Sequence, residues 1–327
     1  MSELDVAVAL VGLIVVVTAL VSRPLERLPV SRPLVALGVG VALGPAALGL
    51  LDAHAWHPSR DVLVREVSRL TIAIGLMAVA LRLPRGWFRA HWRPVSLLLL
   101  VLMPLMWLAT SAVVRLVLGF DWWTSLLIGA VLTPTDPVAA SAIVTGPLAK
   151  KALPERLRHL LSAESGANDG LALPLVMIGI LVLTKPMESA VHEWLTHVLL
   201  VEVLLGAVIG LALGLVVGRA FRWADEHKDM EVSSFLAVTL ALALLALGAA
   251  KLAGGSGVLA VFVAGIAFDS QTRSKERHEE EKIQEAVNLL FTVPAFGLLG
   301  LLLPWNEWLA MGPAALAAVV LILLLRR

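Results

Sequence analysis

Long apolar runs recur along the whole chain, each roughly the length of a membrane span, with short polar stretches between them. No stretch between the runs is long enough to form a soluble domain. Hydropathy therefore predicts an all-α polytopic membrane protein, embedded in a lipid bilayer, with about eleven transmembrane helices. We place these spans near residues 4–22, 33–51, 63–82, 94–118, 122–145, 156–184, 196–220, 232–252, 256–269, 284–304 and 308–325.

The segment from Asp269 to Glu285 is highly charged. Lys282, Ile283 and Ala286 could place a short interfacial helix there, but we favour a solvated loop.

Composition agrees with this pattern. Hydrophobic residues make up 59% of the chain and charged residues 16%, against about 45–50% and about 25% in soluble domains. The absence of Cys from the sequence excludes disulfides and thiolate metal sites. The net charge of +1 gives no indication of a nucleic-acid partner, and we expect none.

Lys and Arg are distributed unevenly between the two ends of the predicted spans. Of the 26 basic residues, 20 follow the odd-numbered spans and six lie at the opposite ends. Basic residues are enriched in cytoplasmic loops. We therefore predict a multi-pass protein of the cell (inner) membrane, with its N-terminus outside and its C-terminal end in the cytoplasm.

The fifth predicted span contains residues that a membrane helix normally avoids, since it reads Leu132-Thr133-Pro134-Thr135-Asp136-Pro137-Val138. Each proline removes a backbone hydrogen bond, so Pro134 and Pro137 should break the helix. Broken helices with free backbone groups near the midplane bind ions in secondary transporters. The alternative is a simple kink in which the Thr135 hydroxyl satisfies the backbone, but this leaves the intramembrane Asp136 unexplained.

The sixth predicted span is polar at its centre, where it reads Ala163-Glu164-Ser165-Gly166-Ala167-Asn168-Asp169-Gly170. Ionisable residues inside a membrane cost about 2.5–3.5 kcal/mol at the bilayer centre and usually mark an ion or proton pathway. Residues four apart share a helix face, so Ser165 lies with Asp169, and Glu164 lies with Asn168. The first pair could present oxygens to a hard cation, and the second could form a hydrogen bond. The alternative is a cluster that only joins helices, for which two carboxylates are excessive.

The motifs of the fifth and sixth spans together resemble those of the NhaP/NHE-type monovalent cation:proton antiporters, the sodium/hydrogen exchanger family. The matching residues are Thr135-Asp136-Pro137 and Glu164-Ser165-Gly166-Ala167-Asn168-Asp169, and the stretch from Gly255 to Gly265 is similar to the family's later glycine-rich helix. The resemblance covers nearly the whole chain. It implies a fold of thirteen helices in two inverted repeats, usually assembled as a homodimer.

The resemblance also implies a role for each polar residue. Asp169 would be the central carboxylate of the Na⁺ site, with Ser165 and Thr135 as further ligands. In the mechanism that we expect, Asp136 would shape the field and the local structure of the broken span. An Asn-Asp pair, here Asn168-Asp169, is associated with electroneutral exchange.

Two features depart from the family pattern. The stretch from Ile72 to Met77 lacks the acidic residue that many members carry there. The chain ends in Leu-Leu-Leu-Arg-Arg, which resembles the end of the family's eleventh helix, where an arginine joins the polar cluster of Glu164 and Asn168. Arg326 or Arg327 would match that arginine, unless both are interfacial anchors.

We therefore expect residues 1–327 to form a single membrane transport domain. Its first repeat would cover residues 4–184 with six helices. The second repeat, residues 196–327, would be incomplete because its final two helices are absent.

The expected function is antiport of Na⁺, or of Li⁺ or K⁺, against H⁺, which serves pH homeostasis. Burial favours the protonated form of Asp169 and a bound cation favours its carboxylate form, so the two ions exclude each other. We expect no enzymatic activity and no cofactor beyond the transported ions. The alternatives are an inactive membrane fragment, a non-transporting subunit, or an intramembrane aspartyl protease using Asp136 and Asp169. The last is disfavoured because Ala167-Asn168-Asp169-Gly170 is not the Gly-x-Gly-Asp of such enzymes.

Overall fold

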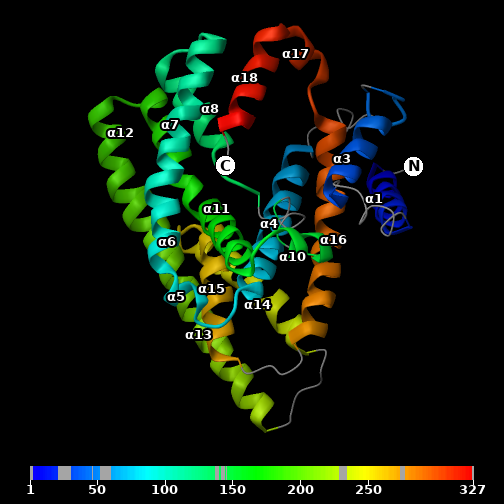
Figure 1. Ribbon diagram of the computed structural model, residues 1–327, viewed down its shortest axis with the longest axis vertical. Coiled ribbons are helices and arrows are strands. Elements are labelled where there is room, and N and C mark those ends of the chain that lie inside the picture. Colours follow the sequence, from blue (N-terminus) through cyan, green and yellow to red (C-terminus); the bar gives the residue numbers. More distant parts are fainter. Residues whose placement is uncertain are drawn as a thin grey trace. The chain divides into compact units, whose positions relative to one another are not determined.

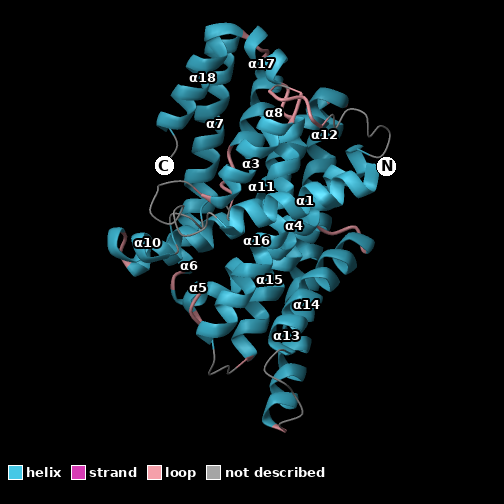
Figure 2. Cartoon of the chain, turned by 90° about the vertical axis from the view of Figure 1, so that its right-hand side faces the viewer, coloured by secondary structure: helices cyan, strands magenta, loops and turns pink. Residues whose placement is uncertain are grey.

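The computed structural model describes residues 3–20, 31–45, 47–51, 60–136, 140, 144, 146–227, 234–272 and 277–325. Within these residues every regular element is a helix, and no strand occurs among them (Figure 2). The prediction of an all-α fold is confirmed.

Two compact units emerge from the contacts within the chain. The first comprises Met1–Gly75 with His278–Ala310, and the second comprises Leu76–Arg277 with Met311–Arg327. These units are discontinuous in the sequence, unlike the two sequential repeats predicted for residues 4–184 and 196–327. The division into repeats stays a prediction.

In the first unit, α3 and α16 pack closely. A side chain at Gly40 would overlap the carbonyl oxygen of Gly297, so only glycine lets the two backbones approach this closely. The buried core beside this contact contains Ile14, Ala36, Val293 and Leu301. The unit is built from α1 (Glu3–Leu20), α3 (Arg32–Leu43), most of α4 (Arg60–Arg82), most of α16 (Arg277–Leu302) and α17 (Trp305–Ala310).

The second unit holds most of the long apolar helices. Among the described residues, four helices are long and apolar enough to cross a membrane: Trp92–Leu118, Glu155–Thr184, Met187–Glu226 and Phe235–Leu252. The total of about eleven spans stays a prediction. The elements of this unit are α5 (Trp87–Ala90), α6 (Trp92–Leu97), α7 (Met103–Val113), α8 (Trp122–Leu132), α10 (Gly146–Ala152), α11 (Glu155–Thr184), α12 (Met187–Glu193), α13 (Leu204–Glu226), α14 (Ser234–Leu252), α15 (Gly257–Gln271) and α18 (Gly312–Leu325), with π-helical stretches at Leu98–Leu102, Val114–Leu118 and Trp194–Val203.

A stripe of glycines brings α13 against α15, and the two helices run side by side in Figure 1. Gly206, Gly210, Gly214 and Gly218 recur at intervals of four, and all four are buried. A side chain at Gly210 would overlap the carbonyl oxygen of Ala260. The tight contact fixes α15, which in turn packs against α11.

The expectation of a solvated loop from Asp269 to Glu285 is wrong where the structure describes it. Helix α15 continues to Gln271, and α16 begins at Arg277 and runs without interruption into the apolar segment that ends at Leu302. The first turns of α16 are rich in Glu, Lys, Arg and Gln, which have high helix propensity. A segment of this composition extends the helix instead of ending it.

Candidate cation site

The break in the fifth span is present at Pro134. Helix α8 begins at an N-cap, Asp121, which accepts hydrogen bonds from the backbone N–H groups of Trp123 and Thr124 at 3.0 and 3.1 Å. It ends at Leu132, and the chain from Thr133 to Asp136 is not helical. The second proline of the motif, Pro137, lies outside the described residues.

The carbonyl groups at the end of α8 are partly satisfied by the chain itself. The hydroxyl of Thr133, which is fully buried, donates to the carbonyl oxygen of Gly129 at 2.7 Å. This bond stabilises the last turn of α8 at the point where Pro134 interrupts the backbone pattern. Thr135 therefore lies three residues beyond the last residue of α8, whose final turn is stabilised by this bond.

Helix α11 runs unbroken past this point and carries the polar residues of the sixth span. Glu164, Ser165 and Asn168 are buried, with exposed fractions of 2%, 2% and 0%. Asp169 is half-buried, whereas Asp136 at the broken end of α8 is exposed. The polar residues of α11 therefore form a buried cluster that opens at Asp169.

Three side chains join the broken end of α8 to α11. The amide nitrogen of Asn168 donates to Thr135 Oγ1 at 2.5 Å and to Glu164 Oε1 at 2.8 Å. The Thr135 hydroxyl donates to the other carboxylate oxygen, Glu164 Oε2, at 3.4 Å. The expected hydrogen bond between Glu164 and Asn168 is present, and Thr135 completes a closed triangle with them.

Asp169 lies on the neighbouring face of α11, together with Ser165. The Ser165 hydroxyl donates to the carbonyl oxygen of Ser162 within its own helix, at 3.3 Å. Asp136 and Glu164 both lie close enough to Asp169 to act on it electrostatically. The structure thus gathers three carboxyl groups around the start of the break, and the role of Asp169, Ser165 and Thr135 as Na⁺ ligands stays a prediction.

Arg326 and Arg327 lie outside the described residues. In the part of the chain that the structure describes, no three His, Asp or Glu side chains are arranged to hold a metal ion. An ion held here would depend on hydroxyl, amide and backbone oxygens as well as on carboxylates.

Sequence reasoning did not identify the helix that covers the back of the site. Phe262 of α15 packs against Gly166, and Leu259 packs against Gly170, so each glycine accommodates one large side chain. The spacing of Gly166 and Gly170 indicated a close contact with another helix, but the sequence of α11 does not show which helix that is.

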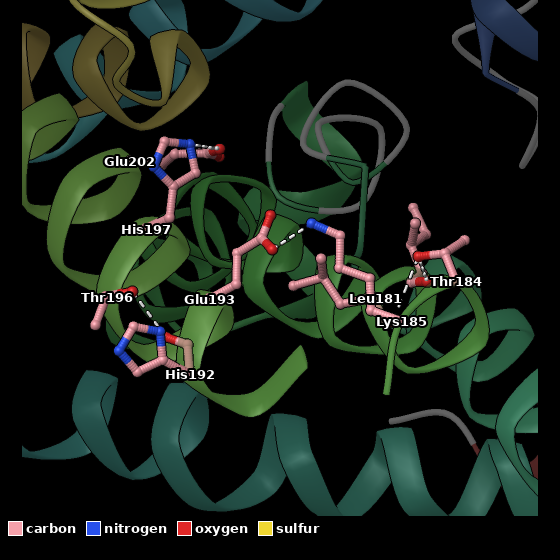
Figure 3. A network of polar contacts seen from close by, with 9 residues as sticks. Leu181, Thr184, Lys185, His192, Glu193, Thr196, His197 and Glu202 are labelled. Atoms are coloured by element: carbon pink, nitrogen blue, oxygen red, sulfur yellow. Dashed lines mark hydrogen bonds and ion pairs between the residues drawn. The ribbon is translucent and has the colours of Figure 1, made fainter. Parts of the chain in front are cut away.

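A second polar network, also missed by sequence reasoning, extends from the end of α11 across α12 into the π-helical stretch Trp194–Val203 (Figure 3). Lys185 pairs with Glu193, and His197 Nε2 lies 3.5 Å from a carboxylate oxygen of Glu202. His197 and Glu202 are five residues apart, a spacing that the π-helical stretch Trp194–Val203 brings onto one face. Since exposed ion pairs contribute little free energy, we assign this network to local structure.

The broken end of α8 is hydrogen-bonded to buried polar groups of α11, within a set of apolar helices. This arrangement is typical of ion-coupled secondary transporters. Sequence comparison specifies the family. Residues 11–327 match the family described as "Sodium/hydrogen exchanger, transmembrane", and the chain belongs to it.

Individual relatives support this assignment. The chain is 33% identical over 311 residues to Na(+)/H(+) antiporter 2 of Zygosaccharomyces rouxii, covering 94% of this chain and 38% of that protein. It is 24% identical over 329 residues to the K(+)/H(+) antiporter NhaP of Alkalimonas amylolytica, covering 100% of this chain and 54% of that protein. The chain therefore spans less than two thirds of the length of these relatives. Because they are antiporters, the chain belongs to a family of transporters and not of enzymes, as expected.

The fold is similar to that of a solved antiporter. The structure of the sodium proton antiporter MjNhaP1 from Methanocaldococcus jannaschii superposes with a TM-score of 0.73 at 19% identity, covering 98% of this chain and 79% of that chain. This likeness confirms the antiporter fold class that the sequence predicts.

Proposed function

We propose that the protein is a cation:proton antiporter that exchanges Na⁺ for H⁺ across the cell membrane, with Asp169 as the carboxyl group for which the two ions compete. The observation that carries this proposal is the hydrogen-bonded triangle of Thr135, Glu164 and Asn168, which holds an unwound helix end beside Asp169.

The triangle leaves Asp169 as the carboxyl group best placed for exchange. Glu164 is almost fully buried and is held by two neighbours, so its oxygens serve the structure. Asp169 is only half-buried, so part of its side chain stays accessible. A cation or a proton at Asp169 would also reduce its repulsion with the nearby charges of Asp136 and Glu164.

The ligand chemistry of the site does not select one monovalent cation over another. Hydroxyl, carbonyl and carboxylate oxygens suit Na⁺, Li⁺ and K⁺, and the two relatives described above are named for Na⁺ and for K⁺. We propose Na⁺ first, because the more similar relative is named for it. Electroneutral exchange follows if one proton is released at Asp169 for each cation bound, since Asn168 carries no charge. A homodimer with its N-terminus outside completes the proposal.

The test is exchange in proteoliposomes, followed with a pH-sensitive dye after addition of Na⁺ or K⁺. The variant Asp169→Asn should abolish exchange, since an amide cannot take up and release the proton. The variant Asp225→Asn, which makes the same change at an exposed site on α13, should exchange normally. In the unaltered protein, the apparent KM for Na⁺ should rise as the pH falls, because protons occupy the same carboxyl group.

Normal exchange by Asp169→Asn would exclude this site. An apparent KM independent of pH would contradict competition at one carboxyl group. Absence of exchange by the unaltered protein would favour a non-transporting subunit or an inactive fragment.

A further inference from the structure

A basic cavity lies away from the cation site, where α5, α6 and the start of α11 meet. Its volume is about 520 Å³. None of its lining residues is acidic, and three of them are arginines that come from two separate segments. The lining consists of Arg89, Ala90, His91, Trp92, Arg93, Pro94 and Arg156.

Aromatic contacts brace the wall of this cavity. The buried Trp87 stacks on His91 with their ring centroids 4.4 Å apart, and it meets His159 of α11 edge-to-face at 6.0 Å. His91 Nδ1 lies within hydrogen-bond distance of the Trp87 carbonyl oxygen, at 3.0 Å. These contacts hold α5 and the start of α6 against α11. Arg93 and Arg156, which line the cavity, therefore lie on helices that are packed together.

The three arginines are available to an external anion. Within the described part of the chain, no carboxylate forms an ion pair with Arg89, Arg93 or Arg156, although other basic residues of the chain have such partners. The guanidinium of Arg93 lies 5.7 Å from the ring centroid of Trp92. Arginine forks match the geometry of phosphate oxygens and bind them with two hydrogen bonds at once.

An exposed apolar stripe begins directly below Arg93. Leu97, Leu100, Leu105 and Leu108 follow it at intervals of three to five residues, from α6 through the π-helical stretch Leu98–Leu102 into α7, and all four are exposed. Trp92, 56% exposed, sits at the top of this stripe, where membrane proteins favour tryptophan at the level of the lipid headgroups. A basic cavity above a long apolar stripe is complementary to an amphiphile with an anionic head.

We propose that Arg89, Arg93 and Arg156 bind the phosphate group of an anionic phospholipid whose acyl chains lie along the stripe Leu97, Leu100, Leu105 and Leu108. A free phosphate ion would use the arginines but would leave the stripe uncovered. The arginines belong to the loops that the basic-residue distribution places in the cytoplasm, where the anionic lipids of the inner leaflet lie.

Lipid binding to the purified protein in neutral detergent tests this site, with phosphatidylglycerol and phosphatidylcholine titrated separately and bound lipid counted by native mass spectrometry. The unaltered protein should bind phosphatidylglycerol in preference to phosphatidylcholine. The double variant Arg93→Gln/Arg156→Gln should weaken phosphatidylglycerol binding about 25-fold, from about fivefold for each arginine. The matched control Arg219→Gln/Arg222→Gln removes the same charge from the end of α13 and should change binding less than about twofold.

A third variant and a competitor distinguish the source of the phosphate. Leu100→Gln alters the stripe without touching an arginine, and it should weaken phosphatidylglycerol binding while the protein stays folded. Inorganic phosphate at millimolar concentration should not displace the lipid. Equal binding of both lipids, equal losses in the two double variants, or full displacement by inorganic phosphate would each overturn the proposal. If the double variant does not fold, Arg93→Gln alone should show the fivefold loss.

Discussion

Asn168 uses both hydrogens of its amide nitrogen in the triangle with Thr135 and Glu164. It is fully buried, and its neighbour Glu164 is almost fully buried. The buried side chain of Glu164 needs hydrogen-bond donors from the protein, because burial removes the hydrogen bonds that water would provide and an unsatisfied buried polar group destabilises the fold. Asn168 therefore stabilises Glu164 and at the same time holds the broken end of α8 through Thr135.

The first stability prediction concerns this residue. Asn168→Ala removes the donors to the buried Glu164 and the half-buried Thr135, so it should lower the free energy of unfolding by about 1–3 kcal/mol. The control Thr184→Val removes an exposed hydroxyl that bonds only to carbonyl groups of its own helix, and it should change stability by less than about 0.5 kcal/mol. Thermal unfolding in detergent measures both, and equal melting temperatures for the two variants would show that the triangle does not stabilise the fold.

At the scale of helices, the sequence predicted what depends on local composition. Apolar runs gave the helical segments, and Pro134 gave the break at the end of α8. The pairing of Phe262 with Gly166 could not be predicted, because it depends on how α15 is oriented by its contact with α13. The charged start of α16 was mistaken for a loop because hydropathy separates membrane from water, while helix propensity decides whether a solvated segment stays helical.

Two glycine substitutions test the packing of α15 and should have opposite signs. Gly210→Ala places a methyl group against the carbonyl oxygen of Ala260, a backbone atom that cannot rotate away, so α15 must shift. Overpacking of this kind costs about 1–3 kcal/mol. Because α15 carries Leu259 and Phe262 against α11, this variant should also impair exchange.

Gly248→Ala is the matched control. Gly248 lies inside α14 with nothing within 4 Å of an added methyl group, so the change should stabilise the protein by about 0.5–1 kcal/mol through helix propensity. Both variants are compared by thermal unfolding and by exchange in proteoliposomes. A stable, fully active Gly210→Ala variant would show that the close contact of α13 with α15 is dispensable.

At the scale of the whole molecule, the distribution of basic residues along the chain predicts how the protein is oriented in the membrane. From the 20-to-6 division of basic residues we predict which side of the membrane each loop faces. That assignment also places the basic cavity on the cytoplasmic side and Lys185, in the network of Figure 3, on the outside. The orientation is thus a prediction on which the leaflet of the bound lipid depends.

The orientation can be tested with single cysteines, because the natural sequence contains none. Glu188, between the sixth and seventh spans, and Arg85, after the third span, are both exposed. In intact cells a membrane-impermeant thiol reagent should label the Glu188→Cys variant and leave the Arg85→Cys variant unlabelled until the membrane is permeabilised. Each position flanks a strongly apolar segment, so a thiol that reacts from the wrong side would require a span to be lost or added. Labelling of Arg85→Cys alone in intact cells would show the opposite topology, and with it the opposite leaflet as the source of the phospholipid.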